Sequence, residues 1–189
     1  MKKQKTSQSP RLTREQWLAR SLEILGEAGP GELRIDTITA KMGVSKGSFY
    51  WHFKNRADYI ESLAKYWDLW SNDQVIDRIK SMKAESITKM KSLITSVIGG
   101  NLGAYDAAVQ MLMHKEPQIA PIVTKGFMKR LKLLHLLFGK MGFKGDQLES
   151  RKRLFVGYFV LDAIMIDQES KKQRLTQALK MLDLLTEFS

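Results

Sequence analysis

The stretch GVSKGSFYWHFKNR, from Gly43 to Arg56, decides the fold class of this chain. It places four aromatic side chains and a histidine in the five consecutive positions 49–53, with basic residues on both sides. A buried strand would not carry so much charge at its edges. An ordinary surface turn would not expose so many rings. A short helix with a buried face and a solvent face accounts for both features.

The residues around Gly43 predict two short helices joined by a tight turn. Helices are expected over about 35–42 and 46–53, with Gly43 at the left-handed turn between them. Phe49 and Phe53 are four residues apart, so they share one face and should bury against the preceding helices. This spacing is typical of a helix-turn-helix, in which the last helix lies in the major groove of DNA.

The charge of the chain favours a polyanionic partner. It has 31 basic and 20 acidic residues, a net charge of +11 and an isoelectric point near 9.8. Residues 1–56 hold 11 of the basic residues but only 5 of the acidic ones, so the excess is densest around the motif. Gly47 removes bulk at a helix N-terminus, which attracts phosphate, and Lys54 and Arg56 lie just beyond.

Composition excludes several other classes of protein. The chain has no cysteine, which excludes disulfides, thiol-ligated metals and thiol nucleophiles and fits the cytoplasm. The basic N-terminus leads into no apolar segment, so no secretory signal is expected. The most apolar run, residues 154–166, is too short to span a bilayer and contains Asp162. No metal site or cofactor is expected.

Helical periodicity extends over nearly the whole chain, which predicts an all-α protein of about nine helices. Thr13 with Gln16, and Ser170 with Gln173, form capping boxes, and Pro121 predicts an irregular helix start nearby. Besides the two short helices, we expect a helix between Thr13 and Gly29, a long helix from Asn55 to about 82, and helices over about 87–97, 102–113, 117–141, 147–167 with Asp146 as its cap, and 171–188.

The segment ITAKMGVSKGSFYWHFKNR, residues 38–56, resembles the tetracycline-repressor (TetR-like) family, as does REQWLARSLEILGEAGPGELRI before it. The resemblance implies a homodimeric transcription regulator with a helix-turn-helix domain at its N-terminus and a helical C-terminal domain that senses a small molecule. The composition of residues 1–10 predicts a flexible basic arm, and the resemblance implies a DNA-binding domain over 11–56 and an effector-binding and dimerisation domain over 57–189.

Carried over residue by residue, the resemblance also implies which side chains contact DNA. It puts the base contacts on Lys46, Gly47, Ser48 and Trp51, and the phosphate contacts on Tyr50, His52, Lys54 and Thr37. The full predicted set is Arg34, Thr37, Ser45, Lys46, Gly47, Ser48, Tyr50, Trp51, His52 and Lys54. Two positions depart from the family pattern: Arg34 stands where a threonine cap is common, and Thr39 where a small residue is usual.

The same resemblance proposes an effector pocket and a dimer interface in the C-terminal domain, and the alternative for each is ordinary packing within the chain. The pocket would be lined by Trp67, Trp70, Tyr105, Met111, His114, Phe127 and Leu131, and would take an apolar or aromatic molecule. The interface would be formed by Leu154, Tyr158, Leu161, Met165, Leu175, Leu179 and Leu182, in a four-helix arrangement across two subunits.

The leading hypothesis is a dimeric repressor that a small-molecule effector releases from its operator. The first alternative is a helix-turn-helix regulator without a small-molecule effector. The second is an all-α enzyme, which the sequence disfavours because it has only three scattered histidines and neither an H-E-x-x-H motif nor a phosphate-binding loop.

Overall fold

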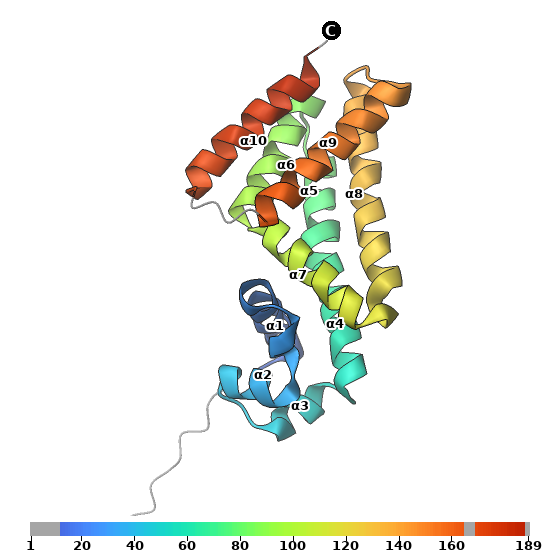
Figure 1. Cartoon of the computed structure of the whole chain (residues 1–189). Helices are drawn as coiled ribbons and strands as arrows, with labels where there is room; N and C mark the ends of the chain where they lie inside the picture. The colour runs from blue at the N-terminus through green and yellow to red at the C-terminus, as the bar shows by residue number, and fades with distance from the viewer. Residues whose placement is uncertain (1–11, 165–168, 188–189) are drawn as a thin grey trace, which may run out of the picture.

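The chain folds into helices stacked along one long axis (Figure 1). The computed structural model describes residues 12–164 and 169–187, and these contain no strand, as the all-α prediction requires. The helices are α1 (Arg14–Ala28), α2 (Ile35–Met42), α3 (Lys46–His52), α4 (Arg56–Asp68), α5 (Gln74–Ser81), α6 (Ser86–Gly99), α7 (Leu102–Lys115), α8 (Ala120–Lys140), α9 (Gly145–Ile164) and α10 (Lys171–Thr186). Three short turns lie between them: η1 (Pro30–Leu33), η2 (Leu69–Asp73) and η3 (Pro117–Ile119).

Helices α1 to α3 lie together at one end of the molecule, and we name them the head. Its core contains buried leucine, isoleucine and methionine side chains together with aromatic rings, several of which meet edge to face. Trp17 of α1 lies 5.9 Å from Phe49 and 6.1 Å from Phe53, measured between ring centroids. Tyr59 of α4 lies 5.0 Å from Phe53, so the first turns of α4 belong to the same core. Such ring pairs add to the stability that burial alone provides.

Helix α4, the turn η2 and helix α5 make one continuous rod from the head into the C-terminal domain. The turn η2 is a π-helical turn, and the backbone stays helical on both sides of it. With α4 and α5 counted as one rod, the described residues contain nine helices. The predicted long helix is therefore confirmed, and the π-turn in it could not be foreseen from periodicity.

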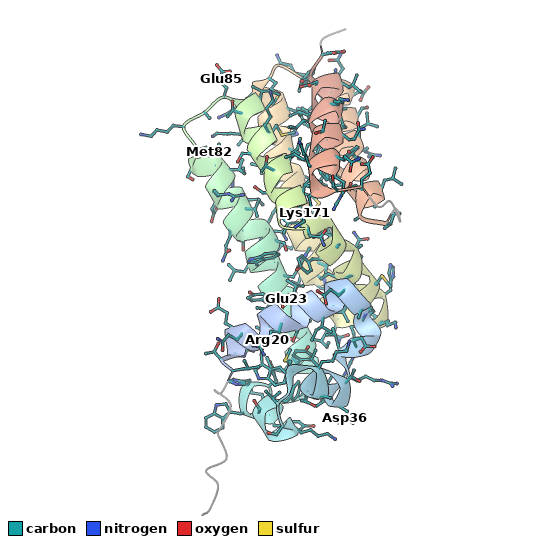
Figure 2. The ribbon with its side chains drawn as sticks, turned by 90° about the vertical axis from the view of Figure 1, so that its left-hand side faces the viewer. Arg20, Glu23, Asp36, Met82, Glu85 and Lys171 are labelled. Atoms are coloured by element: carbon teal, nitrogen blue, oxygen red, sulfur yellow. The ribbon has the colours of Figure 1, made fainter. Side chains whose placement is uncertain are left out.

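The C-terminal domain has a second core, formed by α5, α6, α8, α9 and α10. Met90, Ile94, Phe138 and Leu182 are fully or almost fully buried there. Helix α7 packs on α1 and also on α9, so it connects the head to this domain. Figure 2 shows Asp36 of the head and the turn from Met82 to Glu85 at opposite ends of the molecule.

Most local predictions from the sequence are confirmed. Both capping boxes form, and Gly43 has φ of 66° in the left-handed region that favours glycine. The turn η3 provides the irregular start before α8. The prediction of Asp146 as a helix cap was wrong, because α9 already begins at Gly145 and Asp146 lies in its first turn.

The two departures from the family pattern are accommodated locally. Arg34 is the N-cap of α2 but makes no side-chain hydrogen bond to the helix. Thr39 is buried, and its hydroxyl donates to the carbonyl of Ile35 at 2.7 Å. The extra polar atom in the helix crossing is therefore paired. Within the described ranges, every helix is too short or too polar to cross a lipid bilayer.

Candidate nucleic-acid interface and ligand cavity

Helix α3 presents its polar, ring-bearing face to solvent. Ser45 caps the helix by accepting a hydrogen bond from the backbone N–H of Ser48 at 3.2 Å. Phe49 points into the head and is fully buried, whereas Tyr50 is 57% exposed and Trp51 is 69% exposed. Neighbouring rings thus separate to opposite sides of α3, as the angular argument from the sequence requires.

The structure brings the predicted DNA contacts together at the end of the head. They come from α2, α3 and the short segment after α3. The exposed members are Arg34, Ser45, Lys46, Gly47, Tyr50, Trp51 and Lys54, and the half-buried members are Thr37, Ser48 and His52. Their contact with DNA remains a prediction, since exposure makes a side chain available without identifying its partner.

His52 makes a contact that the sequence did not reveal. Its Nε2 lies 2.8 Å from the backbone carbonyl of Leu12, so this nitrogen carries the proton and donates it. The Nε of Arg14 approaches the carbonyl of His52 at 3.4 Å. His52 therefore attaches the residues before α1 to the end of α3, and the nitrogen that donates to Leu12 is not available to donate to a phosphate.

Lys46 also has a partner within the head. Its Nζ lies 2.5 Å from a carboxylate oxygen of Asp36 on α2, and both side chains are exposed. The hydrogen bond and the charge of Asp36 raise the pKa of Lys46. A phosphate or base edge would have to compete with Asp36 for this lysine.

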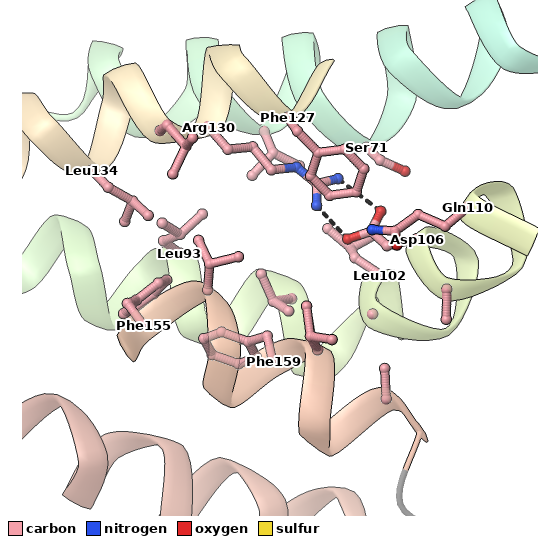
Figure 3. A pocket seen from close by; sticks show the side chains of 18 of the residues that line it. Ser71, Leu93, Leu102, Asp106, Gln110, Phe127, Arg130, Leu134, Phe155 and Phe159 are labelled. Atoms are coloured by element: carbon pink, nitrogen blue, oxygen red, sulfur yellow. Dashed lines mark hydrogen bonds and ion pairs between the residues drawn. The ribbon is translucent and has the colours of Figure 1, made fainter. Parts of the chain in front are cut away.

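A cavity of about 370 Å³ lies in the C-terminal domain, between α7, α8 and α9, with η2, α5 and α6 behind them (Figure 3). Most of its wall is aliphatic or aromatic. A volume in this range suits a small organic ligand. The lining residues are Ser71, Val75, Ile76, Leu93, Val97, Leu102, Gly103, Asp106, Ala107, Gln110, Met111, His114, Phe127, Arg130, Leu131, Leu133, Leu134, Phe155, Val156, Phe159, Val160, Ala163 and Ile164.

Four predicted pocket residues line this cavity and three do not. The lining members are Met111, His114, Phe127 and Leu131. Trp67 is fully buried in the core that extends from the head, so it does not line the cavity as predicted. Trp70 and Tyr105 do not line it either, because their rings pack on each other edge to face, 5.5 Å apart, outside the cavity.

One end of the cavity is polar, and its main residues were missed from the sequence. Arg130 of α8 makes a two-pronged ion pair with Asp106 of α7. The Nε of Arg130 donates to the side-chain oxygen of Asn72 in η2, and the indole N–H of Trp67 donates to Asp106 at 3.0 Å. These residues are far apart in the sequence and follow no motif, so only the packing of three helices reveals them.

A neighbouring contact holds α8 against the π-turn. Lys129 lies 2.8 Å from Asp68, which precedes η2, and 2.6 Å from Asp73, the last residue of η2. Partial burial lowers the pKa of Lys129, but the hydrogen bonds and charges of both aspartates outweigh this and raise it. The close approach needs Gly126, because a Cβ there would lie 2.5 Å from the side-chain nitrogen of Asn72.

The predicted dimer residues divide between the surface and the core. Leu154 and Leu161 are exposed on α9, and Val160 and Ile164 are exposed beside them. Tyr158, Leu175 and Leu179 are half-buried against the second core. Leu182 is fully buried in its own chain and therefore leaves the predicted interface, and Met165 lies outside the described residues.

An ion pair joins the base of the rod to the end of α7. Arg56, the first residue of α4, lies 2.5 Å from Glu116, which follows α7. Partial burial raises the pKa of Glu116, but hydrogen bonds from Gln118 and Arg56 outweigh this effect and lower it. The helix that lines the cavity is thus tied to the rod at two places, near Arg56 and near Trp67.

The N-terminal part of the chain matches a known family. Residues 18–63, which include α2, α3 and most of α1, match the family described as "Bacterial regulatory proteins, tetR family". No curated protein sequence matched the chain.

Solved structures of transcriptional regulators share the fold over nearly the whole chain. FadR from Bacillus subtilis, in complex with stearoyl-CoA, is 19% identical with a TM-score of 0.68, covering 92% of this chain and 98% of that one. AibR, in complex with isovaleryl coenzyme A and operator DNA, is 12% identical with a TM-score of 0.68, covering 89% and 97%. A TetR-family regulator from Streptomyces coelicolor is 16% identical with a TM-score of 0.67, covering 90% and 92%.

Proposed function

We propose that this chain, a TetR-like DNA-binding regulator by its matched N-terminal segment and its fold, is a homodimeric repressor. Two copies of α3 would enter successive major grooves of an operator. A small apolar molecule in the cavity would release the protein from that operator. A regulator of this kind binds DNA and is not an enzyme. The proposal places it in the cytoplasm.

The observation that carries the proposal is the exposed face of α3. A short helix with a filled core behind it has no structural need to expose Tyr50 and Trp51. Basic side chains lie beside these rings, and the N-terminus of α3, without a bulky side chain at Gly47, can approach a phosphate. Rings and cations on one protruding helix fit the groove and backbone of a duplex.

Dimerisation is supported by the exposed apolar side of α9. Leu154 and Leu161 are seven residues apart, so they lie on the same side of α9, and both are exposed in a single chain. A two-fold axis along this face would bury them against their own copies. It would also present two α3 helices, whose half-sites would lie about 34 Å apart, one turn of DNA.

Effector control is supported by the path from the cavity to the head. Helix α7 lines the cavity, contacts α1, and is tied to the rod through Asp106 and Glu116. An effector can act only if it binds the DNA-free arrangement better than the DNA-bound one. A preference worth about 3 kcal/mol would lower operator affinity about a hundred-fold. The structures of FadR and AibR contain acyl-CoA molecules, so acyl thioesters belong among the first compounds to test.

Operator binding is tested by selecting duplexes from a random pool with the purified chain and then measuring the salt dependence of binding. We expect a pseudo-palindromic site. Lys54→Ala should lower affinity for every duplex and reduce the salt slope by about one unit. Lys83→Ala is the matched control, because Lys83 is exposed beside Met82 at the opposite end of the molecule. Equal effects of the two substitutions would contradict the proposed interface.

The dimer is tested by light scattering. Leu161→Arg should give a folded monomer with weak operator binding, since two arginines would meet across the two-fold axis. Leu136→Arg, at an exposed leucine of α8, is the control and should remain dimeric. A dimer of normal mass with Leu161→Arg would exclude this face.

The alternative, a regulator without a small-molecule effector, remains open to a direct test. Thermal-shift screening of apolar compounds would separate the two. If no compound raises the melting temperature, the cavity is a packing defect and the alternative is favoured.

A further inference from the structure

Leu12, which precedes α1, is held against the end of α3 by two contacts. Its side chain is buried and belongs to the core of the head. Its backbone carbonyl accepts the hydrogen bond from His52, the last residue of α3, at 2.8 Å. The segment that precedes Leu12 is therefore joined to the head beside the end of α3.

Arg14, the first residue of α1, fixes the same attachment point. Its Nε donates to the backbone carbonyl of His52 at 3.4 Å, and a terminal nitrogen donates to the hydroxyl of Ser62 on α4 at 2.6 Å. Its guanidinium carbon lies 5.2 Å from the centre of the Phe53 ring. The attachment point is thus tied to both α3 and α4.

The N-terminal segment, residues 1–11, lies outside the described residues, but its sequence, MKKQKTSQSPR, is strongly basic. It has a net charge of +4 because it carries no acidic residue and four basic ones, Lys2, Lys3, Lys5 and Arg11. It has no leucine, isoleucine, valine or aromatic residue, so it offers little to bury in a core. Such a charged segment suits contact with a polyanion.

The carboxylates near the attachment point do not neutralise this charge. Asp58 of α4 is already engaged, because one oxygen accepts the backbone N–H of Lys54 at 2.9 Å and the other lies 3.9 Å from Arg14. Glu15 is exposed in the first turn of α1 and supplies a single negative charge. These two carboxylates cannot balance the four cations of the N-terminal segment.

The length of the N-terminal segment matches the dimensions of DNA. Under the proposed function α3 lies in a major groove, so the segment begins next to the duplex. An extended chain spans about 3.3 Å per residue, so residues 1–11 reach about 36 Å. One turn of DNA is about 34 Å long, so this reach includes the phosphates on both sides of the neighbouring minor groove.

We infer that the N-terminal segment is a second DNA-binding element, which contacts the sugar-phosphate backbone beside the groove that α3 occupies. This inference rests on the proposed function, because DNA is the partner in both. The four cations would add affinity for any duplex, whereas α3 would select the sequence.

The added affinity is tested on the full chain by the salt dependence of DNA binding, measured by fluorescence anisotropy. The segment variant carries Lys2→Ala, Lys3→Ala, Lys5→Ala and Arg11→Ala. Each phosphate contact contributes about 0.9 to the slope of log affinity against log salt concentration, so the slope should become shallower by about 3–4 for each bound head. At about 0.1 M salt the affinity should fall at least about tenfold, equally for the selected operator and for a random duplex.

The matched control removes the same charge at the opposite end of the molecule. It carries Lys80→Ala, Lys83→Ala, Lys140→Ala and Lys144→Ala, at exposed lysines near the turns that follow α5 and α8 (Figure 1). The control should nearly keep the slope of the unmodified chain, and both variants should keep its melting temperature. An unchanged slope in the segment variant, or equal changes in the two variants, would overturn the inference.

The position of the N-terminal segment on DNA is tested by tethered cleavage. The chain has no cysteine, so Ser7→Cys provides a single thiol in the middle of the segment, to which an iron–EDTA reagent is attached. The reagent should cut the operator beside each half-site. The same reagent on Lys83→Cys should make no cuts. A Ser7→Cys complex that binds the operator but leaves it uncut would overturn the inference.

Failure of this inference and failure of the proposed function give different results. If the unmodified chain binds no duplex at low salt, DNA binding as a whole is wrong. If the unmodified chain and the segment variant bind the operator with the same affinity and slope, only the N-terminal segment is excluded, and α3 remains the DNA-binding element.

Discussion

The head and the C-terminal domain differ in how completely side chains fill their interiors. In the head, Trp17, Phe49, Phe53 and Tyr59 fill the core with rings in edge-to-face contact. In the C-terminal domain, the packed helices leave a cavity of about 370 Å³. A filled head can hold a rigid outer surface against DNA, whereas a hollow domain can change when a molecule enters it. Under the proposed function, the head would bind DNA through its outer surface, and the C-terminal domain would bind an effector in its interior.

The ion pairs of the two regions also differ, because one is exposed to solvent and the other is mostly covered. Lys46 and Asp36 pair on the outer surface of the head, where solvent weakens the interaction. Arg130 and Asp106 pair beside the cavity, with most of both side chains covered. Removing one partner should therefore matter far more in the C-terminal domain than in the head.

The largest expected effect is on the free energy of unfolding, and it tests whether the head is packed more fully than the region around the cavity. Phe49→Ala should destabilise the protein by about 3–5 kcal/mol, because it opens a cavity in a filled core. Phe155→Ala should lower the free energy of unfolding by about half as much, because Phe155 already borders the cavity and has fewer packing contacts to lose. Urea unfolding measures both. Equal costs would show that the two cores are packed alike.

A smaller effect tests the interior ion pair. Asp106→Ala should lower the free energy of unfolding by about 2 kcal/mol, because Arg130 is left partly buried without its carboxylate. Lys46→Ala should leave the free energy of unfolding almost unchanged, because its pair with Asp36 is exposed to solvent. The double variant Asp106→Leu with Arg130→Met should regain much of the free energy of unfolding that Asp106→Ala loses, as measured by chemical denaturation. If it regains none, the two residues have a role other than charge pairing.

The smallest expected effect concerns the junction between the two domains and depends on pH. Interactions with Arg56 and Gln118 lower the pKa of Glu116 in the folded state, so the stability they provide is present above its unfolded value of 4.5. That stability is lost as the pH falls through the folded pKa. Glu116→Gln should therefore lower the free energy of unfolding by about 0.5–1 kcal/mol at neutral pH and should not change it measurably in acid. A cost that is the same at both pH values would exclude the ion pair as its cause.

The buried and exposed faces of α3 could be predicted from the sequence, because the signals that set them are local. Phe49 and Phe53 separate from Tyr50 and Trp51 by helical angle alone. Gly43 and Ser45 mark the turn and the cap by their own conformational preferences. The contact of His52 with Leu12 was missed because the two residues are 40 positions apart.

The cavity could be predicted only in part. Met111, His114, Phe127 and Leu131 lie on helices that the resemblance placed around a pocket, and they line it. The polar end escaped prediction, because Asp106, Arg130 and Asn72 meet only when three helices pack together. Leu182 was assigned to a surface because periodicity indicates an apolar side without showing what covers it.

The sequence by itself determined most of the helices, most of their caps and the two short helices joined at Gly43. Each of these depends on residues within about two turns of one another, where backbone geometry alone sets which side chains meet. The tertiary structure decided the π-turn, the cavity with its ion pair, and the contact that holds Leu12 against α3. Those features depend on how distant segments pack, because a void and a long-range contact exist only relative to their neighbours.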